Sequence, residues 1–167
     1  MYYVIENKGE VDPKSYYVMG LTSKEDTDDT IGQFGTGNKY GIAALLRAGN
    51  EVIIKSGSTT IKPFLKDVSF RDKEHKLVCL KIGNKTVETG MTVGMGKYHW
   101  EVEHGLRELV ANAIDEGGYR TFSTNKVTGK AGITRIYVSI STETKEFFMN
   151  INKWFNFRTP LFSNVHG

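Results

Sequence analysis

The sequence predicts an α+β fold in which helices cover a mainly antiparallel sheet, and two observations predict it. Short strand-like runs separated by turn residues follow one another between residues 51 and 82, as in an antiparallel meander. Two apolar helices, expected at 42–48 and about 99–116, each follow a glycine-bearing segment and end at glycine. Runs of strands set apart from helices in this way are typical of α+β proteins.

Length and composition describe one ordinary folded domain. The 167 residues, of which 39% are hydrophobic and 25% charged, suffice for one core but not for two, so we expect a single domain over 1–167. No apolar run approaches the ~20 residues of a membrane span, and residues 1–12 lack the basic start and apolar core of a secretory signal. Cys79, the single cysteine, cannot form an intrachain disulfide. We therefore expect a cytoplasmic protein with no membrane partner.

The charge of the chain indicates no partner by itself. The net charge of +3 is the balance of 22 basic and 19 acidic residues scattered along the sequence, so nucleic acid is not indicated. The 18 glycines are more informative, because they gather at 32–41, 90–96 and 117–118. Glycine in such clusters usually lets the backbone come close to another group.

The elements before the meander lead from a strand to a glycine-rich segment. Asp12 followed by Pro13 is typical of a helix N-cap and the first helical residue. In order, we expect a strand at 2–6, a short helix from 13 to about 20, a polar loop at 22–30, and the glycine-rich segment 31–41 that enters the helix at 42–48.

The remaining elements complete the sheet and end in an aromatic segment. Strands are expected at 51–56, 60–64, 66–71, 76–82, 132–141 and 145–151, with a glycine-bearing connection at 83–96 and a polar loop after the helix at 99–116. The segment Phe147–Phe162 is too apolar for a free tail. It is either core or a contact surface for a second copy of the chain or another protein.

The glycine-rich segment is a candidate phosphate cradle. Gly32, Gly35 and Gly37 precede a helix whose free N–H groups and positive dipole end favour an anion. The segment is not a Walker A loop, because the residue directly before Lys39 is not glycine and the residue directly after it is not serine or threonine. It is not a Rossmann fingerprint either, since Tyr40 occupies the place of the third glycine. A plain tight turn before a helix stays open as the alternative.

The helix at 99–116 carries a second polar constellation. At ~100° per residue, Glu108, Asn112 and Asp115 fall within about 60° of one another, opposite the apolar side of the helix. The alternative is an ordinary solvated helix face. Against it, no lysine or arginine follows Glu108 at the fourth residue, and asparagine is an indifferent helix former.

The two constellations together resemble the GHKL superfamily of ATPases, whose nucleotide-binding domain is the Bergerat fold. Ile31–Gly41 resembles the family's second glycine box, closest to the versions in the heat-shock chaperones and the microrchidia ATPases. The pattern Glu108-x-x-x-Asn112-x-x-Asp115 resembles the family's N-box. The resemblance implies a two-layer sandwich of a mixed, mainly antiparallel sheet with helices on one face.

A third segment, Val4–Pro13, resembles the family's first glycine box. Glu6 stands at the position of the adenine-reading aspartate, and Lys8 and Glu10 stand where the family has two glycines. Lys8 either folds back onto Glu6 or Glu10, which preserves selectivity for adenine, or points into the base pocket, which removes it.

The order of the boxes differs from that of the family. Relatives run N-box, first glycine box, second glycine box, whereas here the N-box comes last. The chain therefore resembles a circularly permuted member, with 83–96 as the new connection.

The resemblance implies that Mg-ATP lies between the glycine segment and the helix at 99–116. Asn112 is implied as the magnesium ligand, and Glu108 as the general base that orients the attacking water toward the γ-phosphate. Asp115 either supports the pocket or only solvates the helix end, and residues 20–31 would close as a lid. The implied phosphate-binding residues are Gly32, Gly35, Thr36, Gly37, Asn38 and Lys39.

Two functions follow from the sequence. The first is a domain that binds ATP and Mg²⁺ and hydrolyses ATP slowly, for which Glu108 is the favouring residue. The second is a non-catalytic interaction or regulatory module that keeps the Bergerat fold, with or without nucleotide. The altered first glycine box permits this second function. The lack of the transducer domain found in relatives favours either this function or a sequence that is a piece of a longer protein.

Overall fold

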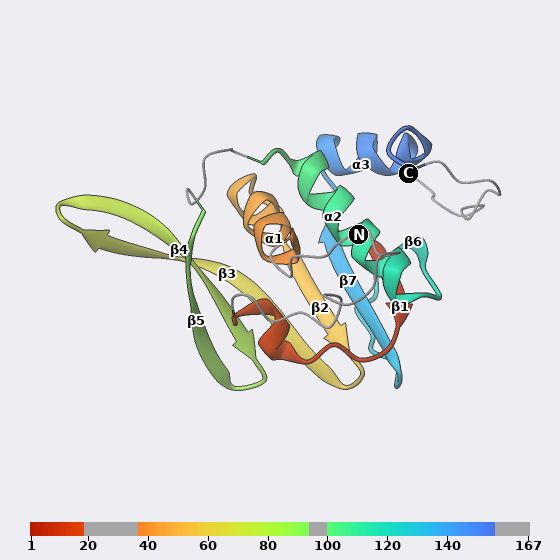
Figure 1. Ribbon diagram of the computed structural model, residues 1–167, viewed down its shortest axis with the longest axis horizontal. Coiled ribbons are helices and arrows are strands. Elements are labelled where there is room, and N and C mark those ends of the chain that lie inside the picture. The colour runs from red at the N-terminus through yellow and green to blue at the C-terminus, as the bar shows by residue number, and fades with distance from the viewer. Residues whose placement is uncertain (19–36, 94–99, 156–167) are drawn as a thin grey trace.

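The computed structural model describes residues 1–18, 37–93 and 100–155, which form one antiparallel sheet with three α-helices on one of its faces (Figure 1). This arrangement confirms the predicted α+β class. The elements are β1 (Tyr2–Lys8), η1 (Pro13–Tyr16), α1 (Gly37–Arg47), β2 (Val52–Ser56), β3 (Thr59–Phe70), β4 (Lys73–Ile82), β5 (Lys85–Thr92), α2 (Val102–Glu116), β6 (Arg120–Thr124), β7 (Ile133–Ser139), α3 (Thr142–Met149) and η2 (Ile151–Lys153).

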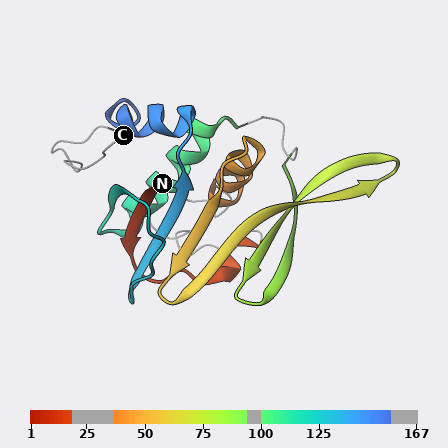
Figure 2. The same cartoon turned by 180° about the vertical axis from the view of Figure 1, so that it is seen from behind.

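The sheet has seven strands in the order β5-β4-β3-β2-β7-β1-β6, and each described pairing is antiparallel. The first strand of the chain therefore lies inside the sheet, between β7 and the edge strand β6. Figure 2 shows the face that the helices leave open. Within the described part of the chain, no helix combines the length and the apolar character needed to cross a bilayer.

The main core fills the space between the helices and the sheet. Side chains alternate along each strand, so that Tyr3 and Ile5 of β1 pack toward the helices, as do Ile136 and Val138 of β7. The intervening Val4 contacts Ile53 and Tyr137 in a small cluster on the open face. The alternation thus assigns every residue of a strand to one of two sides.

Two strand predictions merge into one. The runs at 60–64 and 66–71 form the single long strand β3, which pairs with β4 from Ile61 to Phe70 without a break. Conversely, β5 lies inside the predicted connection 83–96, and β6 lies in the predicted polar loop after α2. Both missed elements are edge strands and carry many polar residues, so they lack an apolar alternation.

The strand predicted at 145–151 is wrong, because this segment belongs to α3 and η2. Ser141 caps α3, because its hydroxyl oxygen accepts a hydrogen bond from the Thr144 N–H. In return, the Thr144 hydroxyl oxygen accepts a hydrogen bond from the Ser141 N–H. Phe147 and Phe148 are buried against the main core. Of the two alternatives for the aromatic segment, its described part is therefore core, and residues 156–162 lie outside the described residues.

Candidate functional site

Two glycines set the contact between α1 and α2. A Cβ atom on Gly41 would lie 2.9 Å from the carbonyl oxygen of Gly105, and one on Gly105 would lie 2.8 Å from the carbonyl oxygen of Gly41. Since backbone atoms cannot give way as a flexible side chain can, only glycine fits at either position. The helices therefore touch backbone to backbone, and this contact aligns the faces that they turn toward each other.

One turn further along α2, Glu108 reaches the first residue of α1. A Cβ atom on Gly37 would lie 2.6 Å from the Oε2 atom of Glu108, so the carboxylate fills the place of the missing side chain. The side chain of Glu108 is half-buried there. A carboxylate at this end of α1 is favoured by the N–H groups and the positive end of the helix dipole. The structure thus brings Gly37 and Glu108 together.

The next turn of α2 joins the second residue of α1. The Asn112 Nδ2 atom donates a hydrogen bond of 2.6 Å to the Oδ1 atom of Asn38. This bond fixes the orientation of the Asn112 amide group. Asp115 follows on the same side of α2 and is half-buried.

Lys39 lies deeper than a surface phosphate ligand would. It is 2% exposed, although it belongs to the first turn of α1. Burial lowers the pKa of its ammonium group, because the charged form loses hydration. The rest of the predicted phosphate cradle and lid lies outside the described residues, since 19–36 includes the lid expected at 20–31 and Gly32, Gly35 and Thr36.

Glu6, the predicted adenine contact, does not lie beside the contact of α1 with α2. It alternates with Tyr3 and Ile5, so its side chain lies on the open face of the sheet, away from α1 and α2. Its carboxylate binds the Nε atoms of Arg120 at 2.8 Å and Arg135 at 2.7 Å. Burial raises the pKa of Glu6, but the hydrogen bonds and charges of the two guanidinium groups outweigh it and leave the pKa below its ordinary value.

Neither alternative for Lys8 describes its position. The Lys8 side chain runs over Gly118, where a Cβ atom would lie 2.5 Å from its Cγ atom. Glu10 instead accepts a hydrogen bond of 2.9 Å from the Gly132 N–H. Among the described residues, Lys8 therefore forms no ion pair with Glu6 or Glu10 and does not enter the space between the helices and the sheet.

Asn7 is a candidate residue that the sequence reasoning missed. The alternation of Tyr3, Ile5 and Asn7 puts its side chain on the side of the helices, where it is buried. The Lys8 N–H donates to the carbonyl oxygen of Gly117 at 2.9 Å, so the end of β1 lies beside the end of α2 that carries the predicted polar face. The sequence held no signal for this choice, because residues 2–5 are all apolar and a period of two fits Asn7 and Glu6 equally well.

Asn7 belongs to a row of buried polar side chains at one end of the sheet. Thr134 of β7 pairs with Asn7, and Ser56 of β2 pairs with Thr134. The Thr134 hydroxyl donates to the Gly9 carbonyl oxygen at 2.7 Å, and the Ser56 hydroxyl donates to the Val11 carbonyl oxygen at 2.8 Å. These bonds hold the chain as it leaves β1, and they give the helix side of the sheet a polar end.

The donor set suits a magnesium ion that is shared with phosphate. In the parts of the chain that the structure describes, no three His, Cys, Asp or Glu side chains gather as a metal site. Mg²⁺ keeps several waters and needs only one or two protein oxygens when a phosphate supplies the others. The Asn112 amide offers an oxygen ligand of this kind, with the Glu108 carboxylate nearby on the same face of α2.

Comparisons with protein families, with curated proteins and with solved structures find no match. The resemblance to the GHKL superfamily is therefore one of sequence motifs.

Proposed function

We propose that this chain binds Mg-ATP where α1 meets α2 and that it hydrolyses ATP slowly. One observation carries the proposal: Glu108 and Asn112, from one face of α2, contact the first two residues of α1, Gly37 and Asn38. The polar side chains of an ordinary solvated helix face would point into water and would not contact the start of another helix. This contact supports the N-box and the second glycine box as halves of one site.

Each residue of the contact has a task that its chemistry fits. The N–H groups at the start of α1 would bind phosphate oxygens. The Asn112 amide, oriented by Asn38, would supply the protein oxygen for magnesium. The Glu108 carboxylate would orient the attacking water and accept its proton.

We assign the base contact to Asn7 in place of Glu6. Asn7 is buried on the helix side, at the end of β1 that lies beside α2. Placing Asn7 at the family's aspartate position also brings Gly9 to the position of the first glycine of that box.

The antiparallel pairing of β1 with β6, the strand that follows α2, supports the proposed circular permutation. We further propose a cytoplasmic location, where ATP and reduced Cys79 are both expected.

Isothermal titration of the full chain with ATP, ADP and GTP, with and without Mg²⁺, tests the site. We expect magnesium-dependent ATP binding that Asn112→Ala weakens by about tenfold or more, since a hydrogen-bonding group next to a charge is lost. Asn84→Ala, in the turn between β4 and β5, is the matched control and should bind as the wild type does. Unchanged affinity in a folded Asn112→Ala protein would contradict the assignment.

Turnover separates the enzyme from the non-catalytic module. We expect Glu108→Ala to lose ATP hydrolysis while ATP binding persists, because a group that orients water acts on the chemical step. Glu103→Ala removes an exposed carboxylate from the same helix and should leave turnover unchanged. Equal turnover in Glu108→Ala and wild type, or no turnover in either, would leave a binding or regulatory module as the function.

A further inference from the structure

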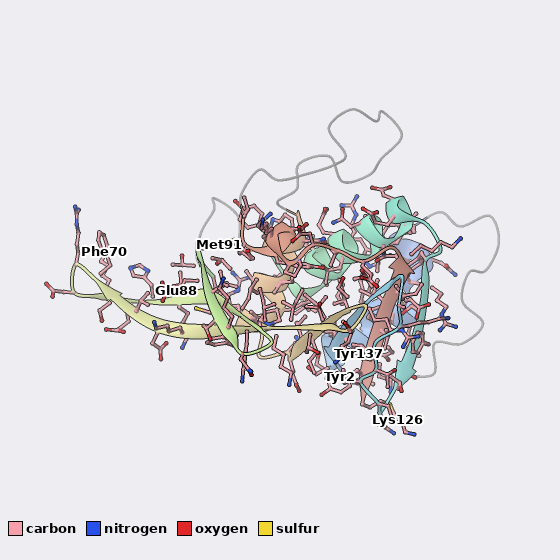
Figure 3. The ribbon with its side chains drawn as sticks, turned by 90° about the horizontal axis from the view of Figure 1, so that it is seen from below. Tyr2, Phe70, Glu88, Met91, Lys126 and Tyr137 are labelled. Atoms are coloured by element: carbon pink, nitrogen blue, oxygen red, sulfur yellow. The ribbon has the colours of Figure 1, made fainter. Side chains whose placement is uncertain are left out.

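The hairpin of β3 and β4 extends well beyond the body of the molecule. β5 pairs with β4 only between Leu77 and Ile82, and β2 pairs with β3 only as far as Ile61. The outer part of the hairpin is therefore a two-stranded ribbon with no further strand on either side. Figure 3 shows Phe70 at its outer end, far from Tyr2 and Tyr137 in the body of the sheet.

The continuous register of β3 and β4 separates the charges of this hairpin by face. The acidic side chains of the two strands, Asp67 and Glu74, lie on the same face as Lys76. The other face, which we call the basic ribbon face, continues the open side of the sheet and carries four lysines and no acidic residue from either strand. It consists of Lys62, Phe64, Lys66, Val68 and Phe70 from β3 and Lys73, His75, Leu77, Cys79 and Lys81 from β4.

Two of these lysines break a rule of sheet stability. Lys62 and Lys81 pair directly across the strands, where like charges repel each other. Lys66 has an acidic neighbour, Glu88 of β5, at 2.9 Å. Among the described residues, Lys62 and Lys81 form no ion pair, although Glu88 lies diagonally across from Lys81. A like-charge pair that no ion pair neutralises within the fold is a natural contact for an external anion.

The hairpin also presents exposed aromatic residues, Phe64 near its base and Phe70 at its tip, where the turn residues are strained. Phe64 is 38% exposed and Phe70 is 63% exposed, both on the basic ribbon face. The Arg71 guanidinium lies over the Phe70 ring, 5.2 Å from its centroid. Arg71 and Asp72 have φ values of 50° and 62°, a left-handed conformation that hairpin turns usually give to asparagine or glycine. Strain of this kind clusters at functional positions.

We propose that the basic ribbon face binds double-stranded nucleic acid through its phosphates, with Phe70 and Arg71 entering a groove. The two-stranded part of the hairpin, beyond Leu77, has the width that the major groove of DNA admits. Lys62 and Lys81, at the base of the hairpin beside β5, would meet phosphates as point charges. Exposed aromatic rings between the lysines suit sugar and base contacts. The small net charge of the chain does not reveal the positive charge of this face, because the acidic residues of the two strands lie on the opposite face and offset it in the sum. The proposal does not depend on ATP binding.

Fluorescence anisotropy with a labelled duplex of roughly 20 base pairs, two turns of DNA, tests the proposal on the full chain at about 0.1 M salt. We expect Lys62→Gln with Lys81→Gln to weaken binding by about tenfold or more and to reduce the slope of log K against log salt by about 1.8, for two lost phosphate contacts. The control, Lys76→Gln with Lys85→Gln, removes the same charge from exposed lysines on the other face and should bind within about twofold of wild type. Phe70→Ser should weaken binding without changing the salt slope.

Three results would overturn the proposal. The first is no duplex binding by the wild type at this salt concentration. The second is an equal loss in both double variants while circular dichroism shows that they are folded, since this would mean a general charge effect. The third is equal or tighter binding of polyglutamate or of single-stranded DNA of the same length, because neither offers the groove that the ribbon is proposed to enter.

Discussion

At the scale of single residues, Glu6 is a structural group that links three strands. Its carboxylate joins Arg120 of β6 to Arg135 of β7 across β1. The Arg120 side chain is exposed, so that half of the interaction is weakened by water, whereas Arg135 is largely buried. Most of the stabilisation therefore comes from the pair with Arg135, whose loss would leave a guanidinium group poorly satisfied.

We expect Glu6→Gln to lower the free energy of unfolding at pH 7 by about 1–3 kcal/mol. The folded state lowers the pKa of Glu6, so its stabilisation is complete above the ordinary value of 4.5 and is lost as the pH falls further. Urea unfolding at pH 7 and below pH 4 should therefore show the gap between wild type and variant closing in acid. Glu88→Gln, in an exposed ion pair, is the control and should cost about 0.5 kcal/mol or less at pH 7. A gap that persists in acid would contradict this role.

At the scale of elements, the contact between α1 and α2 decides whether the two predicted constellations meet. We expect Gly105→Ala to destabilise the fold by about 1–3 kcal/mol, because the added Cβ atom must push two backbones apart and this outweighs the better helix propensity of alanine. It should also weaken ATP binding, because separating the helices moves Glu108 away from Gly37 and Asn112 away from Asn38. Arg107→Ala, an exposed position on α2, is the control for both measurements. A stable Gly105→Ala protein with normal ATP affinity would show that the close approach is not required.

The elements also show how far sequence alone reaches. Both long helices and the central strands follow from apolar periodicity and glycine stops. The edge strands β5 and β6 do not, because a strand paired on one side keeps polar residues on much of its surface. The segment at 145–151 carries apolar residues that suit a strand or a helix, and the cap formed by Ser141 and Thr144 settles it as a helix.

The candidate site was predictable in part for a similar reason. Helical spacing places Glu108, Asn112 and Asp115 on one face without knowledge of the fold. Which of Glu6 and Asn7 faces the helices required the fold, because the motif position alone does not distinguish the two sides of β1. The close approach of Gly41 and Gly105 depends on two helices far apart in the chain, which no local pattern reports.

At the scale of the whole molecule, the two faces of the sheet differ in chemistry. The helix side holds the contact of α1 with α2 above a row of buried polar side chains, and the open side carries the Glu6 ion pairs and the basic ribbon face. Each proposed function thus has its own side of the sheet. Variants on one side should leave binding on the other side unchanged.

The location of nucleotide-induced changes tests the central claim most directly. In ¹⁵N–¹H correlation spectra of the full chain titrated with Mg-ATP, we expect the largest amide shifts at Gly37, Asn38, Glu108 and Asn112, which surround the contact of α1 with α2. The amides of the basic ribbon face should stay in place. Shifts confined to that face or to the Glu6 cluster, or no shifts at saturating Mg-ATP, would contradict a nucleotide site between α1 and α2.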